Sequence, residues 1–223
     1  MGKKIKAVIF DQDGLMFDTE RLSVKAWDAA LAPYGIKLGE DFFRDLRGAR
    51  PEKGAAAFRE RFGDSIDYDS IRKVKRGFSY QWVAEKGVPV KKGLKELLSY
   101  LKENGAKLAI ATASSKEWTQ GNVKGAGVDS YFDEFIYGDM VEEAKPDPAI
   151  FLLAAKRLGV EPGECMVLED SFNGIRAAAA GGFYPVMVPD LTLPTPEIKA
   201  LLAAECESLL EVIGLFKNGT FEL

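Results

Sequence analysis

Short, mostly apolar runs recur along the chain and lack the alternation of polar and apolar residues expected of a half-exposed strand. They cover residues 7–10, 107–111, 135–137, 165–168 and 184–188. Such runs are typical of strands buried on both faces of a parallel sheet. Helical spacing separates them, at 94–105, from 116 onward, after 148, at 171–180 and at 198–216. This alternation predicts an α/β fold with a Rossmann-like parallel-sheet core and helices on both faces.

Between residues 19 and 86 the pattern contains helical spacing but no convincing strand. Helices are predicted from about 19 to the Pro-Tyr-Gly turn at 33–35, and then at about 40–46, 51–62 and 68–85. We therefore expect an all-helical cap domain over 17–91, inserted into an α/β core domain formed by 1–16 and 92–223. The cap would stand over the end of the first strand.

The composition excludes several classes of protein. The 223 residues carry a formal net charge of −4, whereas proteins whose main function is to bind nucleic acid carry a basic excess. The two cysteines, Cys165 and Cys206, form no disulfide framework and favour a reducing compartment. The apolar run near the N-terminus is too short for a signal peptide or a membrane span. We expect a cytoplasmic protein that binds neither nucleic acid nor membrane, as a monomer or a weak homodimer.

The chain contains no histidine. Catalytic sites built on Ser-His-Asp or Cys-His arrangements are therefore excluded, as are histidine-ligated metal sites. Acid–base chemistry must come from carboxylates, lysine, tyrosine or cysteine. A bound metal would be a hard cation with oxygen ligands.

The segment after the first predicted strand is the first candidate for chemistry. Asp11 and Asp13 directly follow the apolar run, and Gly14 comes next. Ligands bind at the carboxyl ends of strands in open α/β sheets, so Asp11 is placed to act as nucleophile or metal ligand and Asp13 as acid or base. Gly14 allows the backbone to approach a ligand closely. Taken alone, the motif is more often an ordinary Asx turn or a fragment of a calcium loop.

Two further strand ends carry polar residues. Thr112 ends a strand beside a predicted helix N-terminus, where a hydroxyl can contact a phosphate, while a following serine would cap the helix. Glu169 and Asp170 end another strand. Adjacent carboxylates repel each other unless a cation lies between them, which predicts a metal site. The alternative is that Asp170 is simply a helix N-cap.

Lys145 is the candidate cation. It precedes Pro146, which biases the backbone of Lys145 toward an extended conformation on a stiff loop. Asp147 is the predicted N-cap of the next helix, with Pro148 at its first position.

The predicted cap carries basic residues near its turns. They are Arg47, Arg50, Arg72, Lys73 and Lys75. They form either a solvated surface interleaved with acids or part of a ligand site, and the sequence leaves both open. A glycine in a turn can bring a backbone and an arginine close to a ligand. Arg47, Gly48 and Lys75 are therefore candidate substrate-binding residues.

Together these motifs resemble those of the haloacid dehalogenase-like hydrolases, in the branch of phosphatases and β-phosphoglucomutases with a helical cap inserted after the first strand. The resemblance covers the whole chain. Its motifs occur in order: Asp11-x-Asp13-Gly14, Thr112, Lys145-Pro146, and Glu169-Asp170 followed by Ser171-Phe172-Asn173-Gly174. Each motif alone is weak, but their order and their placement at strand ends make a chance match improbable.

The resemblance implies the roles of the acids. Asp11 would attack phosphorus and form an aspartyl-phosphate, and Asp13 would act as general acid and then as general base. Mg²⁺ would be held by Asp11, Asp170 and the backbone carbonyl of Asp13, with Glu169 in support.

The resemblance also implies how the phosphate is held. Lys145 and Thr112 would bind its oxygens together with backbone N–H groups near Gly14 and Ala113. The substrate would be a small phosphorylated metabolite, with a sugar phosphate as one candidate, and the cap would choose it.

Departures from the family pattern separate the alternatives. The β-phosphoglucomutases carry a histidine where this chain has Ser23 and an arginine where it has Pro51, so a phosphatase is favoured over a mutase. Haloacid dehalogenases lack the second acid, which is present here as Asp13. A phosphate-binding protein without turnover is a further alternative, against which Asp13 argues because binding alone does not need it.

Overall fold

A sheet of parallel strands forms the centre of the molecule. The computed structural model describes residues 2–39, 42–43 and 51–223. Within these residues, six strands pair in the order β4-β3-β2-β5-β6-β7. They are β2 (Ala7–Phe10), β3 (Lys107–Thr112), β4 (Glu134–Tyr137), β5 (Cys165–Glu169), β6 (Tyr184–Met187) and β7 (Ala204–Glu205). Phe10 of β2 lies opposite Ile110 of β3 and Leu168 of β5, so β2 is central.

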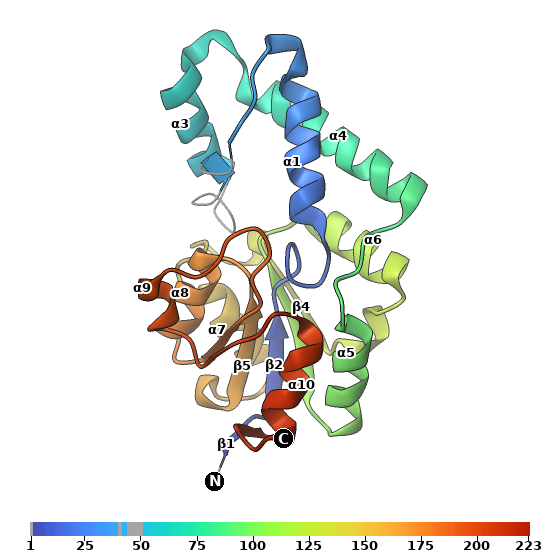
Figure 1. Cartoon of the computed structure of the whole chain (residues 1–223), viewed down its shortest axis with the longest axis vertical. Helices are drawn as coiled ribbons and strands as arrows, with labels where there is room; N and C mark the ends of the chain where they lie inside the picture. Colours follow the sequence, from blue (N-terminus) through green and yellow to red (C-terminus); the bar gives the residue numbers. More distant parts are fainter. Residues whose placement is uncertain (1, 40–41, 44–50) are drawn as a thin grey trace.

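Helices cover both faces of this sheet (Figure 1). On one face lie α5 (Leu94–Glu103), α6 (Lys116–Ala126) and α10 (Leu209–Lys217). On the other lie α7 (Ala149–Leu158) and α8 (Phe172–Ala180). Val8 and Phe10 join the first hydrophobic cluster, whereas Ala7 and Ile9 join the second. The strand is thus buried on both faces, and the predicted α/β fold is confirmed.

The cap helices, α1 (Thr19–Leu31), α3 (Pro51–Phe62) and α4 (Tyr68–Lys86), stand beyond the sheet edge toward which β2 points (Figure 1). Trp27, Leu31, Phe58 and Ile71 belong to a separate hydrophobic cluster among them. The predicted helices at 51–62 and 68–85 are confirmed, while the one at 40–46 lies largely outside the described residues. The predicted domain boundaries stay a prediction.

Short turns of 3₁₀ helix connect several elements. They are η1 (Ala32–Tyr34), η2 (Gly63–Ser65), η3 (Asp129–Tyr131), η4 (Gly138–Met140) and η5 (Pro162–Glu164). Near the two ends of the chain, β1 (Lys3–Lys4) pairs in parallel with β8 (Phe221–Glu222), a small sheet that the sequence pattern did not predict. Among the described residues, none of the helices has both the length and the apolar composition needed to cross a membrane.

The predicted continuous helix at 198–216 is wrong. A short helix, α9 (Pro196–Lys199), is followed by β7 and then by α10. The backbone between the helices is extended because it joins the sheet: Ala203 N donates to Pro185 O and Cys206 N donates to Met187 O. The helical spacing in the sequence came from two separate helices.

The predicted N-cap of α7 is displaced by one residue. The helix begins at Ala149, so Pro148 occupies the N-cap position. Asp147 still satisfies a helix N–H, because its Oδ1 accepts from Ala149 N at 2.9 Å.

Candidate active site

The residues predicted at the strand ends come together in space. Asp11 follows β2, Thr112 ends β3 and Glu169 ends β5. These strands are parallel neighbours, so their carboxyl ends meet at one edge of the sheet. Asp170 and Lys145 complete the group, and all five side chains are buried.

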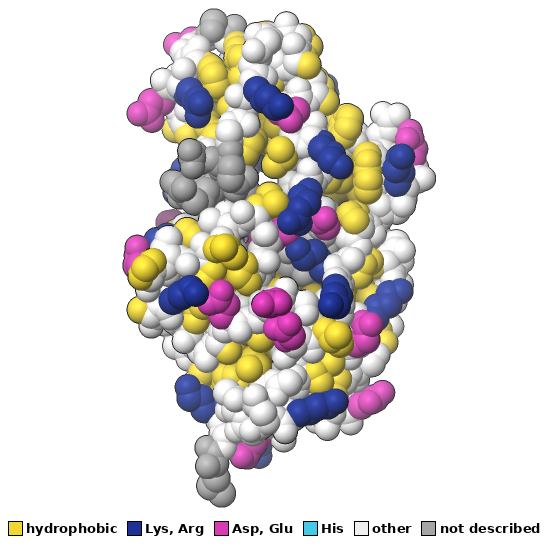
Figure 2. Space-filling model, viewed as in Figure 1, with side chains coloured by type: hydrophobic (Ala, Val, Ile, Leu, Met, Phe, Trp, Pro, Cys, Tyr) yellow, Lys and Arg dark blue, Asp and Glu magenta, His cyan; other side chains and the backbone are white. Residues whose placement is uncertain are grey.

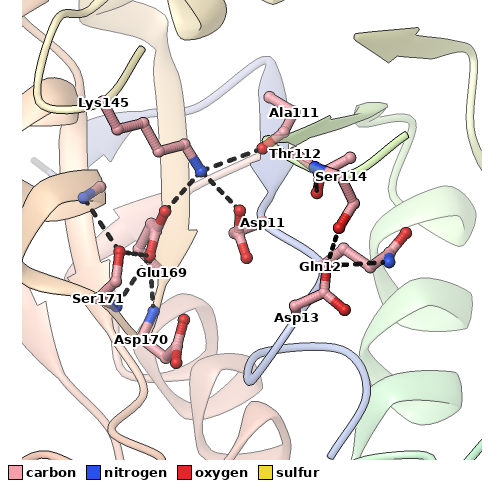
Figure 3. A network of polar contacts seen from close by, with 11 residues as sticks. Asp11, Gln12, Asp13, Ala111, Thr112, Ser114, Lys145, Glu169, Asp170 and Ser171 are labelled. Carbon is pink, nitrogen blue, oxygen red and sulfur yellow. Dashed lines mark hydrogen bonds and ion pairs between the residues drawn. The ribbon is translucent and has the colours of Figure 1, made fainter. Parts of the chain in front are cut away.

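Lys145 links two of the acids (Figure 3). Its Nζ donates to Asp11 Oδ1 at 2.6 Å, to Glu169 Oε1 at 2.7 Å and to Ala111 O at 3.3 Å. These contacts use all three donors of an ammonium group. Burial alone would lower the pKa of Lys145, but the charges of Asp11 and Glu169 raise it above its ordinary value. Lys145 is therefore a fixed cation between two carboxylates.

Glu169 is held on both of its oxygens. Lys145 binds Oε1, while Oε2 accepts from the backbone N–H groups of Asp170 and Ser171 at 3.0 and 2.9 Å. The Ser171 hydroxyl donates to the same oxygen at 2.9 Å. Gly174 packs against this carboxylate so closely that a Cβ there would overlap it. The protein thus fixes Glu169 completely.

Ser171, and not Asp170, is the N-cap residue of α8. Its Oγ accepts from Gly174 N at 3.1 Å and caps α8. Asp170 is left at the strand end with its carboxylate beside the Asp11-Gln12-Asp13-Gly14 loop, where Gly14 has φ +87° and a Cβ would overlap that carboxylate. Glycine is required here by both backbone conformation and space.

Asp11, Glu169 and Asp170 form a cluster that fits a hard cation. One carboxylate oxygen from each lies within 4.8 Å of the others. Burial raises the pKa of Asp11 to about 8, with Lys145 lowering it and Glu169 raising it. Burial, and then the charges of Glu169 and Asp11, also raise the pKa of Asp170. Lys145 offsets only part of this negative charge, so a cation with oxygen ligands would stabilise the ionised cluster.

Asp13 lies on the other side of Asp11 and accepts hydrogen bonds on both oxygens. Oδ2 accepts from Ser114 Oγ at 2.6 Å and from Gln12 Nε2 at 3.2 Å (Figure 3). Oδ1 accepts from Thr19 Oγ1 at 2.6 Å and from Trp118 Nε1 at 3.1 Å. The carboxylate is fixed by neighbours from several segments of the chain.

The sequence prediction missed the partners of Asp13. Ser114 was expected only as a possible helix cap, but Ser115 has that role, accepting from Trp118 N at 3.3 Å. Ser114 N instead donates to Thr112 Oγ1 at 3.0 Å, which turns the Ser114 hydroxyl toward Asp13. No local motif marks Trp118, because its contact depends on how α6 packs.

A cavity of about 360 Å³ lies between the strand ends and the cap helices. Its core side includes Asp11, Asp13, Thr112, Ala113 and Asp170. Its cap side includes Ser23, Trp27, Tyr68, Arg72, Lys75 and Tyr80. The molecule therefore encloses a site with acids on one side and with aromatic and basic groups on the other.

Among the predicted substrate-binding residues, Ala113 and Lys75 line this cavity and Gly14 adjoins Asp170. Burial lowers the pKa of the half-buried Lys75, although Glu20 and Asp13 act in the opposite direction. Arg47 and Gly48 lie outside the described residues. On the described part of the face in Figure 2, basic and acidic side chains are interspersed.

The chain is similar to known proteins over most of its length. The family model for haloacid dehalogenase-like hydrolases matches residues 5–182. A phosphorylated carbohydrates phosphatase of Thermotoga maritima is 32% identical over 96% of this chain and 99% of its own. A fructose-1-phosphate phosphatase, YqaB of Escherichia coli, is 30% identical over 84% of this chain and 98% of its own.

A solved structure has the same fold. It is that of a CbbY variant from Rhodobacter sphaeroides in complex with xylulose-(1,5)bisphosphate. It aligns with a TM-score of 0.80 and 27% identity over 93% of this chain and 96% of that one.

Proposed function

We propose that this chain, which belongs to the haloacid dehalogenase-like hydrolase family, is a Mg²⁺-dependent phosphatase that acts on small phosphomonoesters, with sugar phosphates as the substrate class. The relatives that are named phosphatases support a hydrolase. The observation that carries the proposal is the buried contact of Lys145 with Glu169 and with Asp11, the latter of which lines the cavity together with Asp13.

Asp11 is the proposed nucleophile. Lys145 binds its Oδ1, so Oδ2 would attack phosphorus and form an aspartyl-phosphate. The bond from phosphorus to the leaving oxygen breaks, and its electron pair goes to that oxygen. Asp13 would supply the proton that neutralises the leaving alkoxide.

The second half of the reaction would use the same groups in reverse. Asp13, now ionised, would take a proton from a water molecule as the water attacks the phosphorus of the aspartyl-phosphate. Inorganic phosphate is released and Asp11 is regenerated. Ser114 and Thr19, which bind Asp13 at 2.6 Å each, would hold the carboxylate in place for both steps.

The cation would be held by the carboxylates of Asp11 and Asp170 and by the backbone carbonyl of Asp13. Glu169 would support it from behind, because both of its oxygens are already hydrogen-bonded by the protein. When bound, the cation would reduce the repulsion between the Asp11 carboxylate and a phosphate dianion.

The phosphate oxygens would be bound by groups at the same sheet edge. Thr112 and the backbone N–H of Ala113 line the cavity beside Asp11. The charge of Lys145 lies behind the nucleophile and would attract the phosphate, although its three donors already have protein partners. Preorganised groups of this kind account for most of the catalysis in phosphoryl transfer.

The cap side of the cavity would select the substrate. Arg72 and Lys75 can bind the polar or anionic part of a substrate, and the aromatic side chains of Trp27 and Tyr68 provide apolar lining for the cavity. The two relatives named for phosphorylated carbohydrates and fructose 1-phosphate support sugar phosphates as the class.

Phosphate release from a panel of sugar phosphates, nucleotides and short-chain phosphates tests the proposal. Each compound is assayed with Mg²⁺ and with a chelator. We expect release that requires Mg²⁺ and ranks sugar phosphates first. No release from any compound, together with formation of glucose 6-phosphate from β-glucose 1-phosphate, would show a mutase instead.

A further inference from the structure

The carboxylate of Asp13 has an unusual partner in Trp118. Three of its donors are hydroxyl or amide groups, on Ser114, Thr19 and Gln12. A hydroxyl can rotate and become an acceptor, whereas an indole N–H, like the amide N–H of Gln12, can only donate. The Trp118 Nε1 contact at 3.1 Å therefore keeps Oδ1 of Asp13 as an accepting oxygen.

The other side of Trp118 contacts a cap helix. Its half-buried ring packs on Tyr80 of α4, with centroids 5.0 Å apart and planes inclined at 51°. The preceding residue, Glu117, accepts from Arg76 of α4 at 2.9 Å and from the Tyr80 hydroxyl at 3.4 Å. Arg76 in turn lies 5.2 Å from the centre of the Tyr80 ring. These contacts join α4 to the part of α6 that binds Asp13.

We infer that Trp118 is a positioning residue for Asp13, and that Tyr80 holds its indole in the donating orientation. The inference rests on the proposed function, because it concerns the acid of that reaction. As the bond from phosphorus to the leaving oxygen breaks, the proton passes from Asp13 to that oxygen, and Asp13 is left as a carboxylate. The indole holds Oδ1 and so limits rotation of the carboxylate about its Cβ–Cγ bond.

The dependence on the leaving group tests this role. An alkoxide needs a proton to depart, whereas p-nitrophenolate departs without one. Trp118→Phe keeps a ring against Tyr80 but removes the N–H. We expect its kcat/KM for an alkyl phosphate to fall about tenfold, and its kcat/KM for p-nitrophenyl phosphate to stay within about twofold of the wild type. The parameter kcat/KM is the correct one because it includes the step in which the leaving group departs.

Two reference variants show how large the change in substrate preference is when the acid is removed and when an unrelated tryptophan is replaced. Asp13→Asn removes the acid itself and should show the same preference for p-nitrophenyl phosphate more strongly. Trp82→Phe makes the same substitution elsewhere on α4, outside the residues that line the cavity, and should change neither substrate.

Tyr80→Ala tests the link to the cap and does not depend on the stability of the Trp118 variant. Alone, it should lower kcat/KM for the alkyl phosphate selectively. Combined with Trp118→Phe, it should add little, because both changes act through one indole. A full additional loss in the double variant would overturn the coupling.

Equal losses on both substrates in Trp118→Phe, or no loss on either, would overturn the positioning role. These outcomes differ from a failure of the proposed function. In that case the wild-type protein with Mg²⁺ would release no phosphate from either compound.

Discussion

The core side and the cap side of the cavity use charge in different ways. On the core side, the ion pairs of Lys145 with Asp11 and Glu169 join side chains that are 2%, 12% and 1% exposed. At the cap, Arg76 pairs with Glu117 at a similar distance of 2.9 Å, but these side chains are 58% and 71% exposed. Judged by distance alone, the ion pairs would be similar in strength, whereas their burial shows that they differ.

The difference follows from the surrounding dielectric. Buried charges interact strongly and are costly to leave unpaired, while exposed pairs are screened by water and salt. The core side is therefore fixed and suited to chemistry that needs groups in one geometry. The exposed charged residues on the cap side can change at little cost in stability, which suits selection among substrates.

Asp11→Asn should produce the largest effect and tests whether chemistry resides on the core side. We expect phosphate release to fall by on the order of 10³-fold or more, because the amide is a poor nucleophile. Circular dichroism should show an unchanged fold. Residual activity within tenfold of the wild type would mean that another group attacks phosphorus.

Lys145→Met compares the two sides directly in stability. It leaves the Asp11 and Glu169 carboxylates buried without their ammonium partner, so unfolding in urea should show a loss of about 3–5 kcal/mol. The matched variant, Arg76→Met, removes an exposed pair and should cost less than about 1 kcal/mol. Both variants are unfolded in the presence of a chelator, so that a bound cation does not compensate for the missing ammonium group. Similar losses in the two variants would contradict the contrast.

Gly174→Ala tests how tightly the core side is packed around Glu169. A Cβ there would overlap the Glu169 carboxylate, and we expect a loss of about 1–3 kcal/mol in urea unfolding. Gly125 is exposed in α6 with open space around it, so Gly125→Ala should stabilise by about 0.5–1 kcal/mol. A neutral Gly174→Ala would mean that Glu169 can move without penalty.

Lys75→Ala should produce the smallest effect and tests the selecting role of the cap side. Loss of one charged contact should raise KM for the preferred sugar phosphate about tenfold. The kcat for p-nitrophenyl phosphate should change little, because the core side is intact. A fall in kcat for both substrates would place Lys75 in the chemical step.

The sequence predicted the core side well for a physical reason. Unbroken apolar runs such as Ala7–Phe10 are typical of central strands of a parallel sheet, and parallel strands bring their carboxyl ends to one edge. Asp11, Thr112 and Glu169 could therefore be expected at that edge, and they are neighbours because β3 and β5 flank β2. The predicted roles of these residues in catalysis stay predictions.

The contacts made by helices were less predictable. Trp118 reaches Asp13 only because α6 packs against the sheet at one angle and presents that face to α4. A single helix was predicted at 198–216 because the apolar residues from Ile198 to Phe216 follow helical spacing around Cys206, although edge pairing with β6 extends the chain at β7. Helical periodicity in a sequence identifies a helix, but it does not show which other elements that helix contacts.

Trapping the covalent intermediate shows whether Asp11 is the nucleophile. Asp13→Asn is incubated with Mg²⁺ and p-nitrophenyl phosphate, whose leaving group needs no proton. It is then quenched in acid, and its peptides are analysed by mass spectrometry. We expect the mass of one phosphoryl group on the peptide that contains Asp11, lost after treatment with base as expected for an acyl phosphate. A phosphoryl group on another residue, or none on Asp11 while wild-type protein releases phosphate, would contradict it.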